Sequence, residues 1–526
     1  MKWYFLLSLI PYFAYIIFKS KKYMHMLQQN WYNDGGRYTK WVMGNFEKVF
    51  VVFDVLFIML AFLKGKYATI AFAIFYVIAY IIHKNKVSKE QSKKPLVITA
   101  RIKRLYTTML ILHLLCIIPM IVFYTDANLP AYYILNGLLV YINPFIIWIS
   151  NIINKPIEKM VFNHYKRIAK NKLTSMTNLK KIGITGSYGK TSSKNALNDI
   201  LNVKYNSFAT EKSFNTMNGL MISINNKLDK FSDIFVAEMG AFREGEIKEK
   251  TDFIEPQYAI LTTIGTAHLE SFGSIQNTQK AKFELIESLP EDGIAILNKD
   301  DEYQTSYKIK SKCKKVWVSM RFKEADVYAS DIKLSNKGTT FKVKFADTKK
   351  TIELETKLLG SANVYNVLQA VALAHELGLT DEQIKIGVKR IATIEHRLEL
   401  KKYGDINIID DAYNSNPVGS KMAVEVLGMM PGKKIIVTPG MIELGEKQYE
   451  YNMKFGRQIA KVCDEVILIG EEQTKPIQDG LKKEKYDENK IHILNDVKKA
   501  FPLMKKLSEN TTYVLLENDL PDIFNE

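Results

Sequence analysis

One short run of the sequence has the residue types and spacing of a phosphate-binding loop. Residues 186–192 read GSYGKTS and lie between the apolar run 181–185 and a helical stretch at 193–201. Glycines let backbone N–H groups approach phosphate oxygens, and a helix N-terminus adds a favourable dipole. A lysine after the second glycine would neutralise β- and γ-phosphate charge, and the next hydroxyl would hold Mg²⁺. A plain glycine turn is the alternative, and the Lys-Thr pair favours the nucleotide loop over it. The candidate nucleotide-binding residues of the run are Gly186, Ser187, Gly189, Lys190, Thr191 and Ser192.

Two further apolar runs end in side chains that bind metals or protons. The run 233–237 is followed by Glu238, and the run 258–262 leads to His268. The carboxyl ends of parallel strands meet at one edge of a sheet, where such sheets bind ligands. Glu238 is therefore a candidate Mg²⁺ ligand, with a structural role as the alternative. His268 is a candidate ligand or an ordinary polar residue. Lys282 lies in a helical stretch, 279–286, whose lysines are typical of a solvated face.

The elements that must position these residues form an α/β pattern from residue 181 onward, because short apolar runs alternate with helical stretches. Further strands are predicted near 406–410, 433–439, 465–469, 490–494 and 511–517. The stretch 314–356 is interpreted as a small antiparallel sheet within the first of two domains. A length of 526 residues suggests three or four domains in all.

The formal net charge of +17 is confined to the first third of the chain. Residues 1–180 carry 24 Lys and Arg against 6 Asp and Glu, whereas the remainder carries 49 against 50. This distribution argues against a nucleic-acid-binding surface spread over an enzyme. The three cysteines, Cys116, Cys313 and Cys463, lie too far apart in sequence for a metal, redox or disulfide-scaffold pattern.

Five apolar stretches explain the basic excess, because each is near the length needed to cross a bilayer. The first could be a signal peptide, but it lacks a small-residue cleavage site and four more stretches follow it. Asp54 in the second stretch either faces other helices or lies near an interface. The stretches are residues 3–18, 49–63, 67–82, 108–124 and 131–150.

The basic loops predict the orientation of these spans. Residues 19–47 and 83–106 and the chain after 150 are rich in Lys and Arg, whereas the other loops carry few or none. The positive-inside rule then places the N-terminus outside and everything after about residue 150 in the cytoplasm. Residues 151–180 are predicted to form a basic amphipathic helix and linker.

Several ordered motifs give the soluble two-thirds a family resemblance. The chain resembles the Mur ligases over about residues 181–526, and within that family it is most similar to the ligases that add D-alanyl-D-alanine to the peptidoglycan precursor. Besides TGSYGKT, the motifs are EMGAFREGEI (238–247), TTIGTAHLESFGS (262–274), QKAKFELIESLPEDGIAILNKDD (279–301), LGSANVYN (359–366), DDAYNSNP (410–417) and GMIELG (440–445).

The resemblance implies a P-loop central domain, a Rossmann-like C-terminal domain and residue roles. ATP would bind with two Mg²⁺ ions, and Thr191, Glu238, His268 and Lys282 match the family's positions around the metals. Lys282 falls where the family has a carbamylated lysine. Catalytic roles fall to Lys190, His268 and Lys282. Further nucleotide or domain-joining contacts are implied for Asn298, Asn363, Arg397 and Asp411.

The sequence departs from the family at several places. Ala362 replaces a usual histidine, residues 215–219 read NTMNG, and the C-terminal strand ends ENDLP rather than in a basic segment. Apolar stretches also take the place of the family's soluble domain that binds the UDP-sugar. We therefore expect an acceptor that is lipid-linked or lies at the membrane, with simple anchoring as the alternative.

The sequence thus predicts a multi-pass cell-membrane ligase for cell-wall biogenesis. An acyl phosphate formed from ATP and a carboxyl-bearing envelope precursor would react with an amino-acid or dipeptide amine. The rivals are a poly-γ-glutamate-type synthase, an ATP-driven transporter and an inactive scaffold. The predicted domains are a transmembrane domain of about five helices at 1–150, a linker helix at 151–180, the ATP-binding domain at 181–397 and the C-terminal domain at 398–526.

Overall fold

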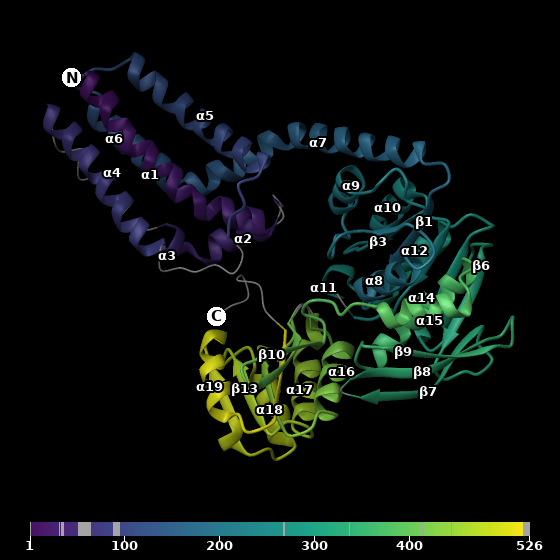
Figure 1. Cartoon of the computed structure of the whole chain (residues 1–526). Helices are drawn as coiled ribbons and strands as arrows, with labels where there is room; N and C mark the ends of the chain where they lie inside the picture. Colours follow the sequence, from purple (N-terminus) through teal and green to yellow (C-terminus); the bar gives the residue numbers. More distant parts are fainter. Residues whose placement is uncertain are drawn as a thin grey trace. The chain divides into compact units, whose positions relative to one another are not determined.

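The apolar N-terminal third of the chain forms helices, and the rest forms two sheets with flanking helices (Figure 1). The computed structural model describes residues 2–30, 32, 36–50, 65–87, 95–266, 269–335, 337–412, 415–442 and 444–518. The chain divides into two units, Met1–His164 and Tyr165–Glu526.

Three helices of the N-terminal unit are long and apolar enough to cross a membrane, by length and composition. They are Trp3–Gln29, Tyr67–Asn85 and Ala100–Val122, and they match the predicted stretches 3–18, 67–82 and 108–124. The predicted stretch 131–150 is divided between two helices bent by 68°, which count as a fourth candidate if taken together. The stretch 49–63, with Asp54, lies almost wholly outside the described residues.

These helices bury aromatic side chains against one another. Tyr12, Phe72, Tyr76 and Tyr133 are almost completely buried and pack with ring-centroid distances of 4.4–6.3 Å. Such pairs prefer tilted or edge-to-face arrangements, as most of these are. The helices are α1 (Lys2–Gln29), α2 (Arg37–Gly44), α3 (Phe46–Val49), α4 (Gly65–Val87), α5 (Ala100–Val122), α6 (Leu129–Tyr141) and α7 (Asn143–Ser175). Helix α7 therefore covers most of the predicted linker.

A nine-stranded sheet begins the second unit, in the order β2-β3-β1-β4-β5-β6-β7-β8-β9. Alternation of side chains on β1 divides its two faces: Ile182 and Ile184 join the core with helix α8, whereas Gly183 faces Leu285 on α12. The strands are β1 (Lys180–Thr185), β2 (Ser207–Ala209), β3 (Ile234–Glu238), β4 (Tyr258–Leu261), β5 (Ile294–Asn298), β6 (Lys314–Ser319), β7 (Val327–Ser335), β8 (Gly338–Phe345) and β9 (Thr351–Thr356).

The predicted antiparallel sheet at 314–356 is confirmed for β7, β8 and β9 and wrong for β6. Strand β6 pairs in parallel with both β5 and β7, and the antiparallel pairs β7–β8 and β8–β9 extend the same nine-stranded sheet. The pairing of β6 with β5 is a long-range contact that no local pattern encodes.

The helices of this sheet carry several residues of the phosphate-binding and metal motifs. They are α8 (Lys190–Leu201), α9 (Met217–Asn226), α10 (Glu246–Ile254), α11 (Leu269–Phe272), α12 (Ile275–Glu287), α13 (Glu302–Thr305), α14 (Ser361–Glu376) and α15 (Asp381–Arg390). Helices α8, α14 and α15 share one core with the sheet.

A six-stranded sheet follows, in the order β10-β11-β15-β12-β13-β14. All neighbours pair in parallel except β10 with β11, so the predicted α/β domain is confirmed and β10 is an antiparallel edge strand that the sequence did not indicate. Its strands are β10 (Glu399–Tyr403), β11 (Ile406–Asp411), β12 (Lys433–Thr438), β13 (Glu465–Ile469), β14 (Ile491–Leu494) and β15 (Thr512–Glu517). Helices α16 (Pro417–Gly428), α17 (Gln448–Ile459) and α18 (Lys475–Lys483) share one core, and α19 (Ala500–Leu507) contributes to the other.

Candidate active site

The phosphate-binding loop joins β1 to α8 as the sequence predicts. Helix α8 begins at Lys190, directly after Gly189, whose φ is +81°. A side chain at Gly189 would collide with the amide oxygen of Asn366, and one at Gly186 would collide with the hydroxyl of Thr262. Both glycines are therefore required by space as well as by backbone conformation. The loop leaves the N-terminus of α8 open to an anion.

The Lys190 side chain lies over this loop. Its Nζ donates to the carbonyl oxygens of Gly186 at 2.7 Å and Ser187 at 3.0 Å. Burial lowers the pKa of Lys190 to about 8, Glu238 opposes this shift, and Arg397 adds to it. The ammonium is thus held where phosphate oxygens would replace the two carbonyls as its partners.

Glu238, at the end of β3, is the centre of a buried polar cluster. Its Oε1 accepts hydrogen bonds from the Thr191 hydroxyl at 3.1 Å and the Asn215 amide at 3.2 Å. Its Oε2 lies 3.3 Å from Nζ of Lys194, and the side chains of Glu238 and Lys194 are 1% and 0% exposed. This lysine, one turn after Lys190 on α8, is a site residue that the sequence reasoning missed.

The residues of this cluster fit a magnesium ion. Mg²⁺ prefers oxygen ligands and is usually held by one or two carboxylates together with substrate phosphates. One cation could contact both the Thr191 hydroxyl and the Glu238 carboxylate, whose oxygens are 3.1 Å apart. Among the described residues, no group of three or more His, Cys, Asp or Glu side chains is arranged to hold a metal. His268 lies outside the described residues.

Lys282, on α12, is buried rather than solvated. Its Nζ lies 3.4 Å from the carbonyl oxygen of Ala241 and 5.3 Å from the centre of the Phe272 ring. Burial, with added repulsion from Lys190 and Lys250, holds the pKa of Lys282 well below its usual value. Burial therefore favours the uncharged amine, which is the form that acts as a nucleophile.

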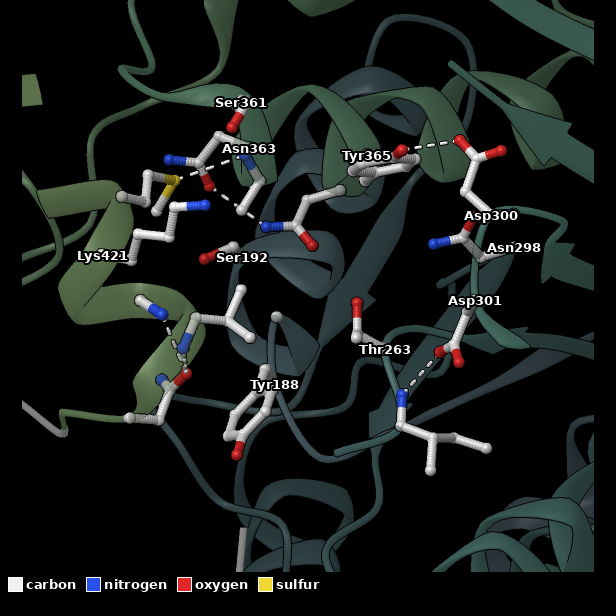
Figure 2. A pocket seen from close by; sticks show the side chains of 18 of the residues that line it. Tyr188, Ser192, Thr263, Asn298, Asp300, Asp301, Ser361, Asn363, Tyr365 and Lys421 are labelled. Carbon is white, nitrogen blue, oxygen red and sulfur yellow. Dashed lines mark hydrogen bonds between the residues drawn. The ribbon is translucent and has the colours of Figure 1, made fainter. Parts of the chain in front are cut away.

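A cavity of about 650 Å³ lies beside the loop (Figure 2). Of the predicted nucleotide contacts, Gly189, Ser192, Asn298, Asn363, Arg397 and Asp411 line it, whereas Gly186, Ser187, Lys190 and Thr191 do not. Its walls come from both sheets and from α14 and α16, so the cavity is formed jointly by the two α/β domains. Further lining residues that the sequence reasoning missed include Tyr188, Thr263, Asp300, Arg321, Tyr365 and Lys421.

Hydrogen bonds fix the cavity wall. Asp300 accepts from the Tyr365 hydroxyl at 2.6 Å (Figure 2). It also accepts from the Ser319 hydroxyl at 2.6 Å, and its backbone N–H donates to the side chain of Asn298. Asn363 donates to the carbonyl oxygen of Leu359 at 2.8 Å. These side chains are held in place before any ligand arrives.

The segment that joins the two domains is held by hydrogen bonds to residues of both domains. Nη2 of Arg397 donates to the Thr191 hydroxyl at 3.4 Å, and the N–H of Leu398 donates to Asp411 at 3.1 Å. His396 and Leu398 both have positive φ, 60° and 49°, a strained conformation for residues with side chains. Arg397, for which the resemblance implies a nucleotide or domain-joining contact, therefore lies in a strained, hydrogen-bonded turn between the two domains (the hinge turn, residues 395–398).

A pair of carboxyl groups, Asp411 partly buried and Glu517 fully buried, lies next to this turn. Asp411 and Glu517 are register neighbours at the carboxyl ends of β11 and β15. Burial raises the pKa of Asp411 to about 6, and burial together with the Asp411 charge raises the pKa of Glu517 well above its usual value. The Ser415 hydroxyl donates to Glu517 at 2.6 Å.

Together, the P-loop, the joint cavity and the second α/β domain define an ATP-dependent ligase built from a nucleotide-binding domain and a Rossmann-like domain. Two family models match: the Mur ligase middle domain over residues 184–374 and the Mur ligase glutamate ligase domain over residues 396–517. The chain belongs to the Mur ligase family.

The similar proteins are of the MurF type. The chain is 32% identical over 339 residues to the UDP-N-acetylmuramoyl-tripeptide–D-alanyl-D-alanine ligase of Buchnera aphidicola subsp. Baizongia pistaciae, covering 64% of this chain and 72% of the relative. It is 31% identical to the ligase of the same name from Escherichia coli K12, covering 55% of this chain and 64% of the relative. The structure of the MurF ligase from Thermotoga maritima in complex with ADP matches with a TM-score of 0.60 and 25% identity, covering 68% of this chain and 80% of that one.

Proposed function

We propose that this chain is a membrane-anchored, ATP-dependent ligase that forms an amide bond on a cell-envelope precursor through an acyl phosphate. The observation that carries the proposal is the position of the open N-terminus of α8, with Lys190 over the loop, beside a cavity that both ligase domains line. Phosphoryl transfer needs positioning and charge neutralisation more than covalent chemistry from the protein.

Different residues would position the substrates and neutralise the phosphate charge. ATP would occupy the cavity, with its phosphates at the N–H groups of the loop and against Lys190. Thr191 and Glu238 would hold Mg²⁺, which when bound neutralises phosphate charge so that a carboxylate can approach. Arg397 connects the hinge to Thr191, so movement of the C-terminal domain would be coupled to the phosphate site. The substrate carboxylate attacks the γ-phosphate and releases ADP, and the amine then attacks the acyl carbon and releases phosphate.

Carbamylation of Lys282 is a further part of the proposal. An uncharged buried amine attacks CO₂ and loses one proton to give an anionic carbamate. The positive charges of Lys190 and Lys250, which oppose a protonated Lys282, would stabilise this product. The carbamate would supply oxygen ligands for a second Mg²⁺. Carbon-13 NMR in ¹³C-bicarbonate should show one carbamate signal in the native chain and none in Lys282→Gln.

We propose substrates like those in the names of the MurF-type relatives, except that the membrane segment would change the acceptor to one that lies at the membrane. Those relatives act on a UDP-N-acetylmuramoyl tripeptide and D-alanyl-D-alanine. Here the helices of the proposed membrane domain (1–150) and linker (151–180) stand where the relatives have a different N-terminal domain, and the ligase domains are proposed at 181–397 and 398–526. We place the N-terminus outside and the ligase domains in the cytoplasm, where ATP is available, with a lipid-linked or membrane-proximal acceptor.

The test is a reconstituted ligation with the full chain in lipid nanodiscs. ATP, D-alanyl-D-alanine and a tripeptide acceptor labelled with ¹⁸O in its terminal carboxylate are supplied, and product mass and phosphate are measured. An amide product with ¹⁸O transferred to phosphate supports the acyl-phosphate route. Lys190→Met should abolish it, whereas Lys230→Met, a surface lysine of the same domain, should not. Phosphate release with no joined product would contradict a ligase, and addition of glutamate in γ-linkage would favour a poly-γ-glutamate-type synthase.

The lipid-linked acceptor has its own test. Activity on a polyprenyl-linked acceptor in the nanodisc is compared with activity on the soluble UDP-linked acceptor, before and after deletion of residues 1–150. We expect the native chain to prefer the lipid-linked acceptor and the deletion to remove that preference. Equal activity of the native chain on both acceptors would leave the membrane segment as an anchor.

A further inference from the structure

Helix α7 has an inverted distribution of polar and apolar side chains between Ile149 and Met160. Ile149, Ile153, Ile157 and Met160 follow one another at intervals of four, four and three, so they share one face of the helix. They are 42%, 47%, 42% and 64% exposed. The buried side of the same turns carries polar residues instead: Ser150, Asn151 and Asn154 are at most 2% exposed.

The inward polar face of α7 pairs with a polar face of α5. Arg101 donates to Asn151 at 3.3 Å, and the Thr108 hydroxyl donates to Asn154 at 2.8 Å. The third contact is a two-pronged ion pair from the Arg104 guanidinium to the Glu158 carboxylate, at 2.7 and 2.8 Å. Polar side chains of the two helices are thus paired with one another on the inward side of α7.

This arrangement is the opposite of that of a helix on the surface of a soluble protein, which buries its apolar stripe and exposes its polar one. It is the arrangement expected in hydrocarbon, where polar groups must be paired internally and apolar side chains face lipid. The neighbouring helix α5 is itself a candidate membrane span, and Ile111, Leu115 and Ile118 on it are exposed. The two helices that pair through polar side chains thus both expose apolar residues.

Charge on α7 indicates which lipids lie beside the stripe. Lys155 and Lys159 are exposed and lie one turn apart. Glu158 is the one acidic residue between residues 149 and 160, and Arg104 neutralises it. The exposed charged side chains of this segment are therefore both basic, and basic side chains complement anionic headgroups.

We propose that Ile149, Ile153, Ile157 and Met160 form a lipid-facing stripe, embedded at the membrane boundary, and that Lys155 and Lys159 bind anionic phospholipid headgroups beside it. This inference rests on the proposed membrane attachment of the N-terminal unit but makes no use of ligase activity. It assigns lipid contact to a segment of α7, which leads into the ligase unit. Helix α7 is not one of the three helices that are long and apolar enough to span a membrane by themselves.

The test uses the full chain in nanodiscs, with Cys116→Ser as background and a bimane fluorophore on single cysteines introduced at Ile153, Ile157 or Met160. Quenching by brominated acyl chains reports lipid contact, and quenching by iodide reports water. Leu115 on α5 is the lipid control, and Phe231, an exposed aromatic residue of the ligase unit, is the water control. We expect lipid quenching at the three α7 positions similar to that at Leu115 and several-fold above that at Phe231.

The alternatives give distinct outcomes. Lipid contact at Leu115 with iodide access at all three α7 positions would overturn the stripe and leave membrane attachment intact. Iodide access at Leu115 as well would overturn both. Protection of the α7 positions from both quenchers would show that protein, from a partner or a second copy, covers the stripe, and would also overturn the proposal.

The headgroup contact is tested with the fluorophore at Met160. Brominated phosphatidylglycerol should quench it more strongly than brominated phosphatidylcholine, because Lys155 and Lys159 enrich anionic lipid around the helix. In Lys155→Gln/Lys159→Gln the two lipids should quench equally, and in Lys230→Gln the difference should persist. Equal quenching by the two lipids in the native chain would overturn the role of the lysines.

Discussion

The Lys194–Glu238 ion pair gives the sharpest test of how the catalytic centre is built. Lys194 has a side-chain exposure of 0%, its Nζ lies 3.3 Å from the Glu238 carboxylate, and it also donates to the carbonyl oxygen of Lys212. Replacement by methionine keeps most of the volume and removes the charge. Removing one partner of a buried pair leaves an uncompensated charge and costs about 3–5 kcal/mol. A domain of this size is stable by about 5–15 kcal/mol, so Lys194→Met should remain folded but be strongly weakened.

The magnitude converts into a measurable change in melting temperature. For a domain of about 200 residues, 1 kcal/mol shifts the melting temperature by about 2–4 °C, so the loss predicted for Lys194→Met corresponds to about 6–20 °C. Thermal unfolding of the ligase unit in nanodiscs, with hydrogen exchange at the amides of β3, separates this effect from the N-terminal unit. Lys190→Met is the matched control, because Lys190 lies one turn earlier on α8 and its ammonium hydrogen-bonds to the backbone carbonyls of Gly186 and Ser187 rather than to a carboxylate.

The double variant Lys194→Met/Glu238→Gln shows whether the loss of stability comes from the uncompensated charge or from packing. If the penalty comes from the uncompensated carboxylate, neutralising Glu238 should recover at least half of the lost stability, although Mg²⁺ binding would not return. Loss of stability that is no smaller in the double variant than in Lys194→Met would show that packing, not charge, explains the effect. A change below about 0.5 kcal/mol in Lys194→Met, the usual range of surface substitutions, would refute the burial of the pair itself.

Three further predictions concern the nucleotide cavity. Gly189→Ala should weaken ATP binding at least tenfold in a fluorescent-nucleotide titration, because its φ is positive and the new methyl group collides with Asn366; unchanged affinity would contradict the loop geometry. The Asp411–Glu517 pair should lower stability as pH rises from about 4 through 6, since unfolded carboxyls release their protons near about 4 and the folded Asp411 has a pKa of about 6. In Glu517→Gln the free energy of unfolding, measured with urea, should depend less steeply on pH between about 4 and about 6. An unchanged pH dependence would rule the pair out as its source. Arg397→Ala should raise the KM for ATP and lower kcat, because it removes a side chain that joins the hinge to the phosphate site; steady-state kinetics that match the native enzyme would exclude that coupling.

Much of the fold could be predicted because its signals are local. The strand–loop–helix at 180–201, Glu238 at the end of β3 and the five parallel strands of the C-terminal sheet all follow from apolar runs and turn residues. The missed features depend on contacts between distant segments. Strand β10 is a polar edge strand, ELKKY, without an apolar alternation, and the parallel pairing of β6 is decided by β5 and not by its own residues.

The same difference between local signals and contacts of distant segments applies to the residues that line the cavity. Ser192, Asn298, Asn363, Arg397 and Asp411 were predicted from their motifs, and all line the cavity. Tyr188 stands inside the predicted loop, so its position was visible although its role was not. Arg321 and Lys421 are far from the loop in sequence. The nine-stranded sheet brings Arg321 to the cavity from the end of β6, and α16 of the second domain brings Lys421.

Two lysines show why the whole site could not be predicted from the sequence. Lys194 and Lys282 both lie on helices whose polar residues indicate a solvated face, and both are almost completely buried. Burial lowers the pKa of each. The Glu238 carboxylate opposes this shift at Lys194, whereas the charges of Lys190 and Lys250 lower the pKa of Lys282 further. The same residue type is thus paired with a carboxylate in one place and set against other lysines in the other. The difference arises from the charges that the fold places around each amine, and no pattern in α8 or α12 alone encodes it.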